Sequence, residues 1–179
     1  GKVFTPDPGI TYSSSFLLDC LPSTKGKSIL DVGCGTGVVS VLRALNGAES
    51  VLATDIDPVA IENTEENISR LGLEKIVQTK QSNLFQNITD SFDYVLANLP
   101  ILQEVWSTEG AGKTINETFI DQVRVYLKPQ GKAYFTWGSF ADISPIREYA
   151  EKSAFTVKEY STEKNNVVWS VFELAQPKN

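Results

Sequence analysis

Short apolar runs alternate with longer amphipathic stretches along most of this chain. Runs rich in β-branched and aromatic residues, bounded by turn-forming residues, predict strands over 28–33, 50–54, 75–79, 92–97 and 131–137. Between them, apolar residues at helical spacing predict helices over 38–47, 59–72, 114–131 and 143–155. Strands that alternate with helices in this way predict an α/β fold with a mostly parallel sheet covered on both faces.

Capping and turn residues set the expected ends of these helices. Asp57 followed by Pro58 is typical of a helix start, with an N-cap and a proline at the first helical position. Gly72 is expected to close the same helix. Pro129 and Gly131 are expected to stop the helix that follows the fourth strand.

The two ends of the chain depart from the alternating pattern. Residues 155–174 predict two strands joined by a polar turn at 163–166, which makes an antiparallel hairpin at the sheet edge. The first 24 residues predict an extended arm with a short helix around Phe16–Leu21. We therefore expect a single domain overall, with an N-terminal arm over 1–24 and the folded body over 25–179.

Composition narrows the possible chemistry. The 179 residues are 41% hydrophobic and 21% charged, as expected for a domain with a substantial core. No apolar run approaches the length of a membrane span, and two cysteines without metal-type spacing favour a cytoplasmic protein with no metal and no membrane partner. The absence of histidine excludes Ser-His-Asp and Cys-His catalysis and histidine-ligated zinc. The net charge of −6 gives no general attraction to nucleic acid, so an RNA partner would have to bind through a small local site.

A glycine-rich stretch, SILDVGCGTGVVSV at 28–41, indicates that the backbone approaches a ligand closely. It lacks the lysine of a phosphate-binding P-loop, and its third glycine, Gly37, comes one residue too early for a dinucleotide fingerprint begun by Gly33 and Gly35. Asp31 heads the stretch, and a carboxylate there repels phosphates but favours an ammonium or sulfonium. We therefore expect a cationic adenosine derivative such as S-adenosylmethionine. The alternative is that the glycines only allow tight packing and Asp31 only caps the turn.

The following elements supply groups suited to a nucleoside. Asp55 ends the second strand at a spacing from the glycines that suits a ribose diol, and Ile56 offers an apolar face to adenine. Asn83 is placed to bond the adenine edge, with Leu84 packing beside it. Cys34 is interpreted as a small residue of the binding loop rather than a nucleophile, because no base is available to activate it.

The segments LDVGCGTG, ATDIDP, SNLF and FDYVLANLP, in this order and spacing, resemble the class I S-adenosylmethionine-dependent methyltransferases. Within that class the chain looks like the small methyltransferase domains, which include ribosomal RNA guanine-N2 and release-factor glutamine methyltransferases. The resemblance implies a Rossmann-like, seven-stranded sheet with a terminal hairpin and S-adenosyl-L-methionine as cofactor. It also implies that Asp31 and the glycine loop hold the methionine moiety, that Asp55 binds the ribose and that Asn83 binds the adenine amino group.

Asn98, Leu99, Pro100 and Ile101 follow the fourth predicted strand and resemble the Asn-Pro-Pro-Tyr/Phe signature of enzymes that methylate planar amines. In that chemistry the Asn oxygen and the next backbone carbonyl accept the two N–H groups and stabilise charge developing on nitrogen. The aromatic that would stack on the acceptor is replaced by Ile101, so Trp106, Phe140 or Trp137 is expected to supply the ring. The alternative is that Asn98 caps a turn that Pro100 stiffens.

The sequence is compatible with three interpretations of the whole chain. The first is a methyltransferase acting by in-line transfer on a nucleic-acid base or an amide, with an RNA, protein or small-molecule acceptor. The second is a non-catalytic scaffold or activating subunit that keeps the cofactor pocket. A nicotinamide oxidoreductase is the third and fits Asp31 and Gly37 poorly. Residues 101–113 form either a substrate lid or an ordinary solvated crossover.

Overall fold

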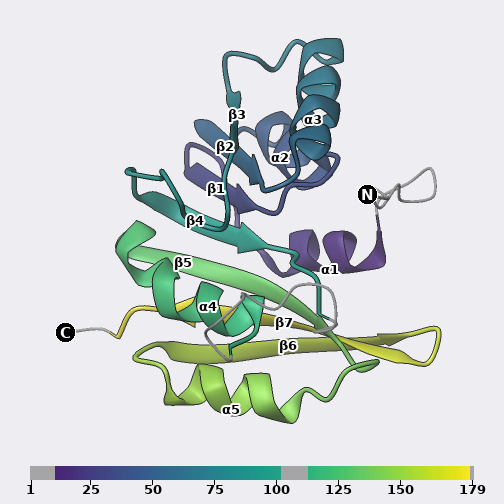
Figure 1. Cartoon of the computed structure of the whole chain (residues 1–179), viewed down its shortest axis with the longest axis vertical. Coiled ribbons are helices and arrows are strands. Elements are labelled where there is room, and N and C mark those ends of the chain that lie inside the picture. Colours follow the sequence, from purple (N-terminus) through teal and green to yellow (C-terminus); the bar gives the residue numbers. More distant parts are fainter. Residues whose placement is uncertain (1–10, 102–112, 178–179) are drawn as a thin grey trace.

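The computed structural model describes residues 11–101 and 113–177 and contains one seven-stranded sheet (Figure 1). The strands follow the order β3-β2-β1-β4-β5-β7-β6 across the sheet. Their bounds are β1 (Ser28–Val32), β2 (Ser50–Asp55), β3 (Val77–Gln81), β4 (Phe92–Ala97), β5 (Leu127–Gly138), β6 (Thr156–Lys164) and β7 (Val167–Ala175). The first five strands pair in parallel, and β7 runs antiparallel to both β5 and β6. The predicted α/β sheet with its terminal hairpin is confirmed.

Helices pack on both faces of the sheet and bury two separate apolar cores. They are α1 (Tyr12–Cys20), α2 (Val38–Leu45), α3 (Pro58–Arg70), α4 (Ile115–Gln122), the 3-10 helix η2 (Val123–Tyr126) and α5 (Ser144–Lys152). One core joins α1, α2 and α3 to the sheet, and the other joins α4, η2 and α5 to it. This arrangement explains why β1 is buried at every position.

Helix starts follow their capping residues. Asp57 caps α3 as predicted, because its carboxylate accepts a hydrogen bond from the Val59 amide at 2.9 Å. The first helix begins four residues earlier than its predicted start at Phe16, because Thr11 caps it by accepting a bond from the Ser14 amide. This earlier start places three further serines on the helix, of which Ser13 and Ser14 lie beside Asn98 at the end of β4.

The prediction that the helix after β4 runs to Pro129 and Gly131 is wrong. The α-helix ends at Gln122, tightens into η2 and gives way to β5 at Leu127, which pairs with Phe92 of β4. Pro129 and Gly131 lie inside β5, where its register with β4 shifts. A Cβ at Gly131 would lie 2.9 Å from the Phe92 carbonyl oxygen, so this glycine marks a close strand approach rather than a helix end.

The order of the strands fixes where a ligand can bind. The chain passes outward from β1 to β2 and β3, then returns to the other side of β1 to form β4 and β5. The sheet therefore has a topological switch point between β1 and β4, and open α/β sheets bind ligands beyond the carboxyl ends of the strands at such a point. Val32 pairs with Ala97 at that end, which brings Gly33 and Asn98 next to one another.

Candidate functional site

The loop after β1 is a fixed turn built on glycines with left-handed backbone conformations. The φ angles of Gly33, Gly35 and Gly37 are +74°, +57° and +77°, in the region that disfavours residues with a Cβ. The amides of Gly33 and Cys34 both donate to the Thr54 carbonyl, at 2.8 and 2.9 Å. These bonds tie the loop to the end of β2.

The three glycines have different surroundings. A Cβ added to Gly33 would lie 2.9 Å from Leu99 Cδ2, and one added to Gly37 would lie 2.6 Å from Thr64 Cγ2. A Cβ added to Gly35 would meet no atom within 4 Å. Gly33 and Gly37 therefore serve internal packing, while the space over Gly35 is open at the mouth of the predicted cofactor site.

Asp55 lies at the end of β2, directly against this open space. Its Oδ2 accepts a hydrogen bond from the Gly35 amide at 2.9 Å, and its Oδ1 accepts one from the Asp57 amide at 3.0 Å. The residue is half-buried, so each oxygen keeps a lone pair that a diol can reach. Next to it, the side chain of Ile56 is 48% exposed, an apolar surface beside a carboxylate.

Asn83 is exposed after β3, and among the described residues its side-chain amide has no hydrogen-bond partner. The neighbouring Ser82 amide donates to the Asp55 carbonyl at 2.8 Å, which ties this segment to the end of β2. Leu84 is buried in the core on the α4 side, with φ at +49°, so only its backbone can take part in binding. An adenosine-bearing cofactor fits these features together: the open space over Gly35, the half-buried Asp55 carboxylate, the apolar face of Ile56 and the Asn83 amide.

Asp31 is buried at the end of β1 and lies against the start of α2. Its Oδ2 accepts a hydrogen bond from Ser40 Oγ at 2.6 Å. Burial raises the pKa of Asp31 to about 6, hydrogen bonds from Ser40 oppose that rise, and the nearby Asp55 carboxylate adds to it. The bond from Ser40 agrees with the alternative interpretation, in which Asp31 stabilises the turn. The structure also places two mutually repelling carboxylates, those of Asp31 and Asp55, beside the glycine loop.

Two polar residues of α3 support the glycine loop from behind. Thr64 Oγ1 donates to the Gly35 carbonyl at 3.0 Å, and Asn67 Nδ2 donates to the Thr36 carbonyl at 2.9 Å. Cys34 is buried against Thr64, with its Sγ 3.5 Å from Thr64 Oγ1, and burial raises the pKa of its thiol. The Cys34 side chain is therefore a protonated packing group of the loop. Thr64 and Asn67, which hold the loop, belong to no sequence motif.

Asn98, at the end of β4, is held by hydroxyl groups from two other elements. Its Nδ2 donates to Ser13 Oγ at 3.1 Å and to Ser14 Oγ at 2.9 Å, both on α1. Its Oδ1 accepts a bond from Thr136 Oγ1 of β5 at 2.6 Å. Since an amide oxygen has two lone pairs, the fixed Oδ1 retains one for a further donor.

The residues after Asn98 differ in exposure. Leu99 is buried against Gly33, Pro100 is exposed, and Ile101 packs partly on the core. Asn116 of α4, which is 1% exposed, donates to the Pro100 carbonyl at 3.1 Å and so fixes the turn from the other side. Trp106 and most of the predicted lid lie outside the described residues.

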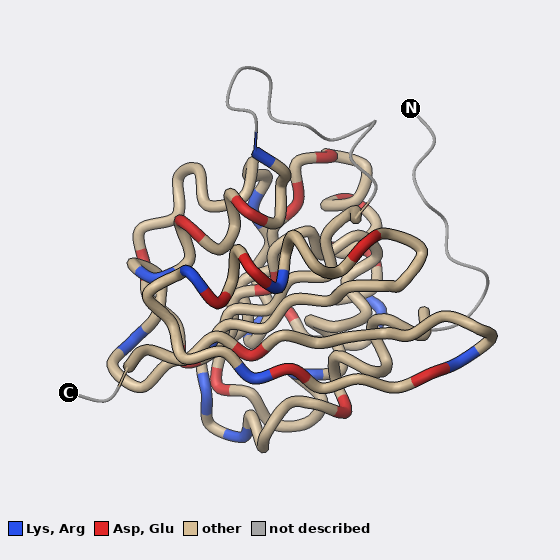
Figure 2. Tube along the Cα trace, turned by 90° about the horizontal axis from the view of Figure 1, so that it is seen from below, with Lys and Arg blue, Asp and Glu red and all other residues tan. Residues whose placement is uncertain are grey.

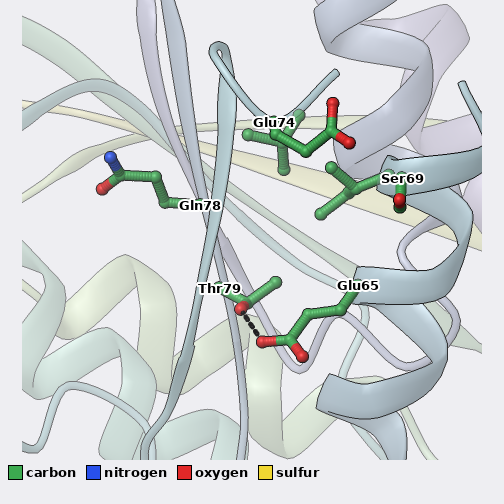
Figure 3. A pocket seen from close by; sticks show the side chains of 7 residues that line it. Glu65, Ser69, Glu74, Gln78 and Thr79 are labelled. Atoms are coloured by element: carbon green, nitrogen blue, oxygen red, sulfur yellow. Dashed lines mark hydrogen bonds between the residues drawn. The ribbon is translucent and has the colours of Figure 1, made fainter. Parts of the chain in front are cut away.

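A separate pocket lies away from the predicted site. A pocket between α3 and edge strand β3 carries Glu65 and Glu74, with Glu65 bonded to Thr79 at 2.6 Å and Gln78 pointing away (Figure 3). It contains none of the predicted site residues. Over residues 11–101 and 113–177, no cluster of His, Cys, Asp and Glu suited to a metal ion is present. Within the same ranges no helix is long and apolar enough to cross a membrane.

Known proteins share this architecture. The sequence matches the family model for the methyltransferase small domain over residues 2–169. It is 30% identical over 167 residues to a ribosomal protein L11 methyltransferase of Bacillus cytotoxicus, covering 88% of this chain and 49% of that protein. The chain thus spans about half the length of this curated relative, and 37% of the L11 methyltransferase of Listeria monocytogenes, with which it is 38% identical.

Solved structures agree on the fold. The structure of an rRNA N2 methyltransferase (RsmC) from Thermus thermophilus, titled as a complex with AdoMet and guanosine, matches with a TM-score of 0.75 at 19% identity. That match covers 96% of this chain and 45% of the other. A ribosomal protein L11 methylase from Lactobacillus delbrueckii matches with a TM-score of 0.71 at 22% identity, covering 89% and 76% of the two chains.

Proposed function

Because this chain belongs to the methyltransferase small domain family, we propose that it transfers a methyl group from S-adenosylmethionine to the nitrogen of a planar amine. The family assignment supports the predicted class of enzyme and its cofactor. The acceptor nitrogen, on a nucleic-acid base or an amide, is the part that we infer from the residues around Asn98.

The observation that carries this proposal is the contact between Leu99 and Gly33. It sets the Asn-Leu-Pro-Ile turn directly against the glycine loop, so a cofactor over Gly35 and an amine at Asn98 would lie side by side. When bound, S-adenosylmethionine supplies an electrophilic methyl group whose sulfur departs as a neutral thioether. Alignment of the two reactants is then the main task left to the protein.

Each proposed binding residue has a distinct role. Asp55 accepts the ribose hydroxyls, Ile56 covers one face of the adenine, and the Asn83 amide bonds its edge. The backbone of the loop formed by Gly33, Cys34, Gly35 and Gly37 lies along the methionine moiety. Asp31 adds negative charge near the cationic groups of that moiety.

Asn98 Oδ1 and the Leu99 carbonyl are proposed to accept the two N–H groups of the amine. As the nitrogen attacks, it becomes pyramidal and gains positive charge, which these two oxygens stabilise. The bonds from Ser13, Ser14 and Thr136 hold the Asn98 amide plane before the acceptor arrives, so little reorganisation is required.

The same three bonds favour the second candidate, a cofactor-binding scaffold, because they occupy both amide hydrogens and one oxygen lone pair of Asn98 within the protein. Incubation of cell extract with the protein and tritiated S-adenosylmethionine separates the two functions. Label in a defined RNA, protein or small-molecule fraction is expected of an enzyme. The relatives' names suggest ribosomal protein L11 and ribosomal RNA as the first acceptors to assay. If the protein binds the cofactor but no fraction is labelled, the scaffold function is favoured.

A further inference from the structure

Three aromatic side chains from distant parts of the sequence meet at the carboxyl edge of the sheet. Tyr12 of α1 and Trp169 of β7 have ring centroids 6.1 Å apart, and Trp169 and Phe140 have centroids 5.7 Å apart. We call these three residues the aromatic edge. The Phe140 side chain is 51% exposed, and Tyr12 and Trp169 are half-buried.

Phe140 is held in place although half of it faces water. It lies in a turn closed by the Ala141 amide, which donates to the Gly138 carbonyl at 3.1 Å, and by Trp137 Nε1, which donates to the Ala141 carbonyl at 3.3 Å. A Cβ on Gly138 would overlap the Phe140 ring, so the glycine lets the ring pack on the backbone. An exposed ring fixed in this way is typical of a binding surface.

The aromatic edge is continuous with the acceptor site. Tyr12 directly precedes Ser13, which bonds Asn98. On the other side, Thr136 bonds Asn98, and two residues further along β5 Gly138 pairs with Trp169. A molecule that presents a nitrogen to Asn98 would therefore extend over these rings.

One basic side chain, that of Lys164, lies beside the aromatic edge. Lys164 Nζ lies 4.5 Å from the centroid of the Tyr12 ring and makes no ion pair within the described part of the chain. The neighbouring Glu163 pairs with Val168 and so points to the opposite face of the hairpin from Lys164 and Trp169. Elsewhere basic and acidic residues are interspersed along the fold (Figure 2).

We propose that the aromatic edge and Lys164 bind a nucleotide of single-stranded RNA next to the base presented to Asn98. Its base stacks on the exposed Phe140 ring, with Trp169, whose plane is inclined at 70° to that ring, beside the base, and its phosphate lies near Lys164. Rings give stacking surfaces for any base, and Lys164 supplies a positive charge beside them in a chain whose net charge is −6. At this position Lys164 favours the phosphate of a nucleotide over a cationic side chain. This inference rests on the proposed function for the position of the methylated base.

A binding titration tests the surface without requiring methyl transfer. A short, fluorescein-labelled oligoribonucleotide of random sequence is titrated with the wild type, Phe140→Ala, Lys164→Gln and Lys158→Gln by anisotropy at several salt concentrations. Lys158 is a matched control, because its Nζ lies 4.3 Å from the Tyr160 ring on the same strand but away from the aromatic edge. Thermal unfolding checks that each variant is folded.

We expect Phe140→Ala to weaken RNA binding roughly tenfold, as for the loss of one stacked base. Lys164→Gln should reduce the slope of log affinity against log salt by about 0.7, the value for one phosphate contact on a single strand. Lys158→Gln should change neither quantity. Equal affinities and slopes for all four proteins, or no RNA binding by the wild type, would overturn the inference. The inference would also be overturned if Phe140→Ala weakened the binding of a lysine-rich peptide but left RNA binding unchanged. A parallel titration with S-adenosylhomocysteine tests the proposed function separately.

Discussion

Leu99 lies against the backbone of Gly33, so that the turn after β4 and the glycine loop after β1 are in direct contact. The two segments are more than sixty residues apart in the sequence and meet because β1 and β4 are neighbours at the switch point of the sheet. The contact joins the proposed cofactor loop to the proposed acceptor turn.

Gly33 and Gly35 should respond differently to alanine. Gly33→Ala adds backbone strain and a clash with Leu99, and we expect it to lower the free energy of unfolding by about 2–4 kcal/mol. Gly35→Ala adds only the strain, about 1–2 kcal/mol, but fills the open space and should abolish binding of S-adenosylhomocysteine. Urea unfolding and calorimetry measure the two effects. Normal cofactor binding by folded Gly35→Ala would exclude the space over Gly35 as the site.

Asp31 should make the protein less stable as pH rises. The pKa of Asp31 is raised by burial to about 6 from an ordinary value of 3.8, so the folded state favours the protonated carboxyl. Its stabilising contribution is complete below pH 3.8 and is lost as pH rises through 6. Relative to Asp31→Asn, the wild type should lose about 3 kcal/mol of unfolding free energy between pH 4 and pH 7.

Urea unfolding of both proteins at several pH values checks the Asp31 prediction. Ser40→Ala serves as a control, since loss of the hydroxyl that donates to the carboxylate should raise the pKa of Asp31 further. A stability difference between wild type and Asp31→Asn that stays constant from pH 4 to pH 7 would show that Asp31 has an ordinary pKa.

Asn67 should support cofactor binding without touching the cofactor. Asn67→Ala removes the bond to the Thr36 carbonyl, and we expect affinity for S-adenosylhomocysteine to fall by up to about tenfold as the loop loosens. Asn63→Ala on the same helix is the matched control, because Asn63 makes no side-chain hydrogen bond within the described residues. Equal losses in both variants would point to α3 as a whole rather than to the loop contact.

Asn98→Ala should separate binding from chemistry. We expect unchanged affinity for S-adenosylhomocysteine. The methyl-transfer rate should fall by at least about 100-fold, because one of two charge-stabilising acceptors is lost. Thr136→Val keeps Asn98 but removes the bond that orients its oxygen, so a smaller loss of rate with unchanged acceptor KM is expected. Retained turnover in Asn98→Ala would exclude this residue from the acceptor site.

Much of the fold could be predicted from local signals. The β-branched runs of β1, β2 and β4 and the Asp57-Pro58 cap of α3 specify their elements within a few residues. The misplaced end of α4 has a physical cause: Val123 and Leu127 continue the helical spacing of apolar residues, and sequence alone does not show that Leu127 pairs with Phe92. Long-range strand pairing overrode the local pattern there.

Only the site residues that belong to recognisable sequence motifs could be predicted. Gly35, Asp55 and Asn98 come from recognisable segments and lie on one edge of the sheet. The groups that hold them in place are short hydroxyl or amide side chains, such as Ser14 and Asn67, with no motif of their own. Their partners lie tens of residues away, so only the folded arrangement reveals them.

The most direct test of the account is isothermal calorimetry of the wild type with S-adenosylmethionine, S-adenosylhomocysteine and NADH, repeated with Asp55→Ala. Asp57→Asn is a control that keeps the amide donating to Asp55 while removing a neighbouring carboxylate. We expect both sulfur nucleosides to bind the wild type and the Asp57 variant, binding to be lost in folded Asp55→Ala, and NADH to give no heat. Binding of NADH without either sulfur nucleoside, or full S-adenosylhomocysteine affinity in Asp55→Ala, would contradict the account.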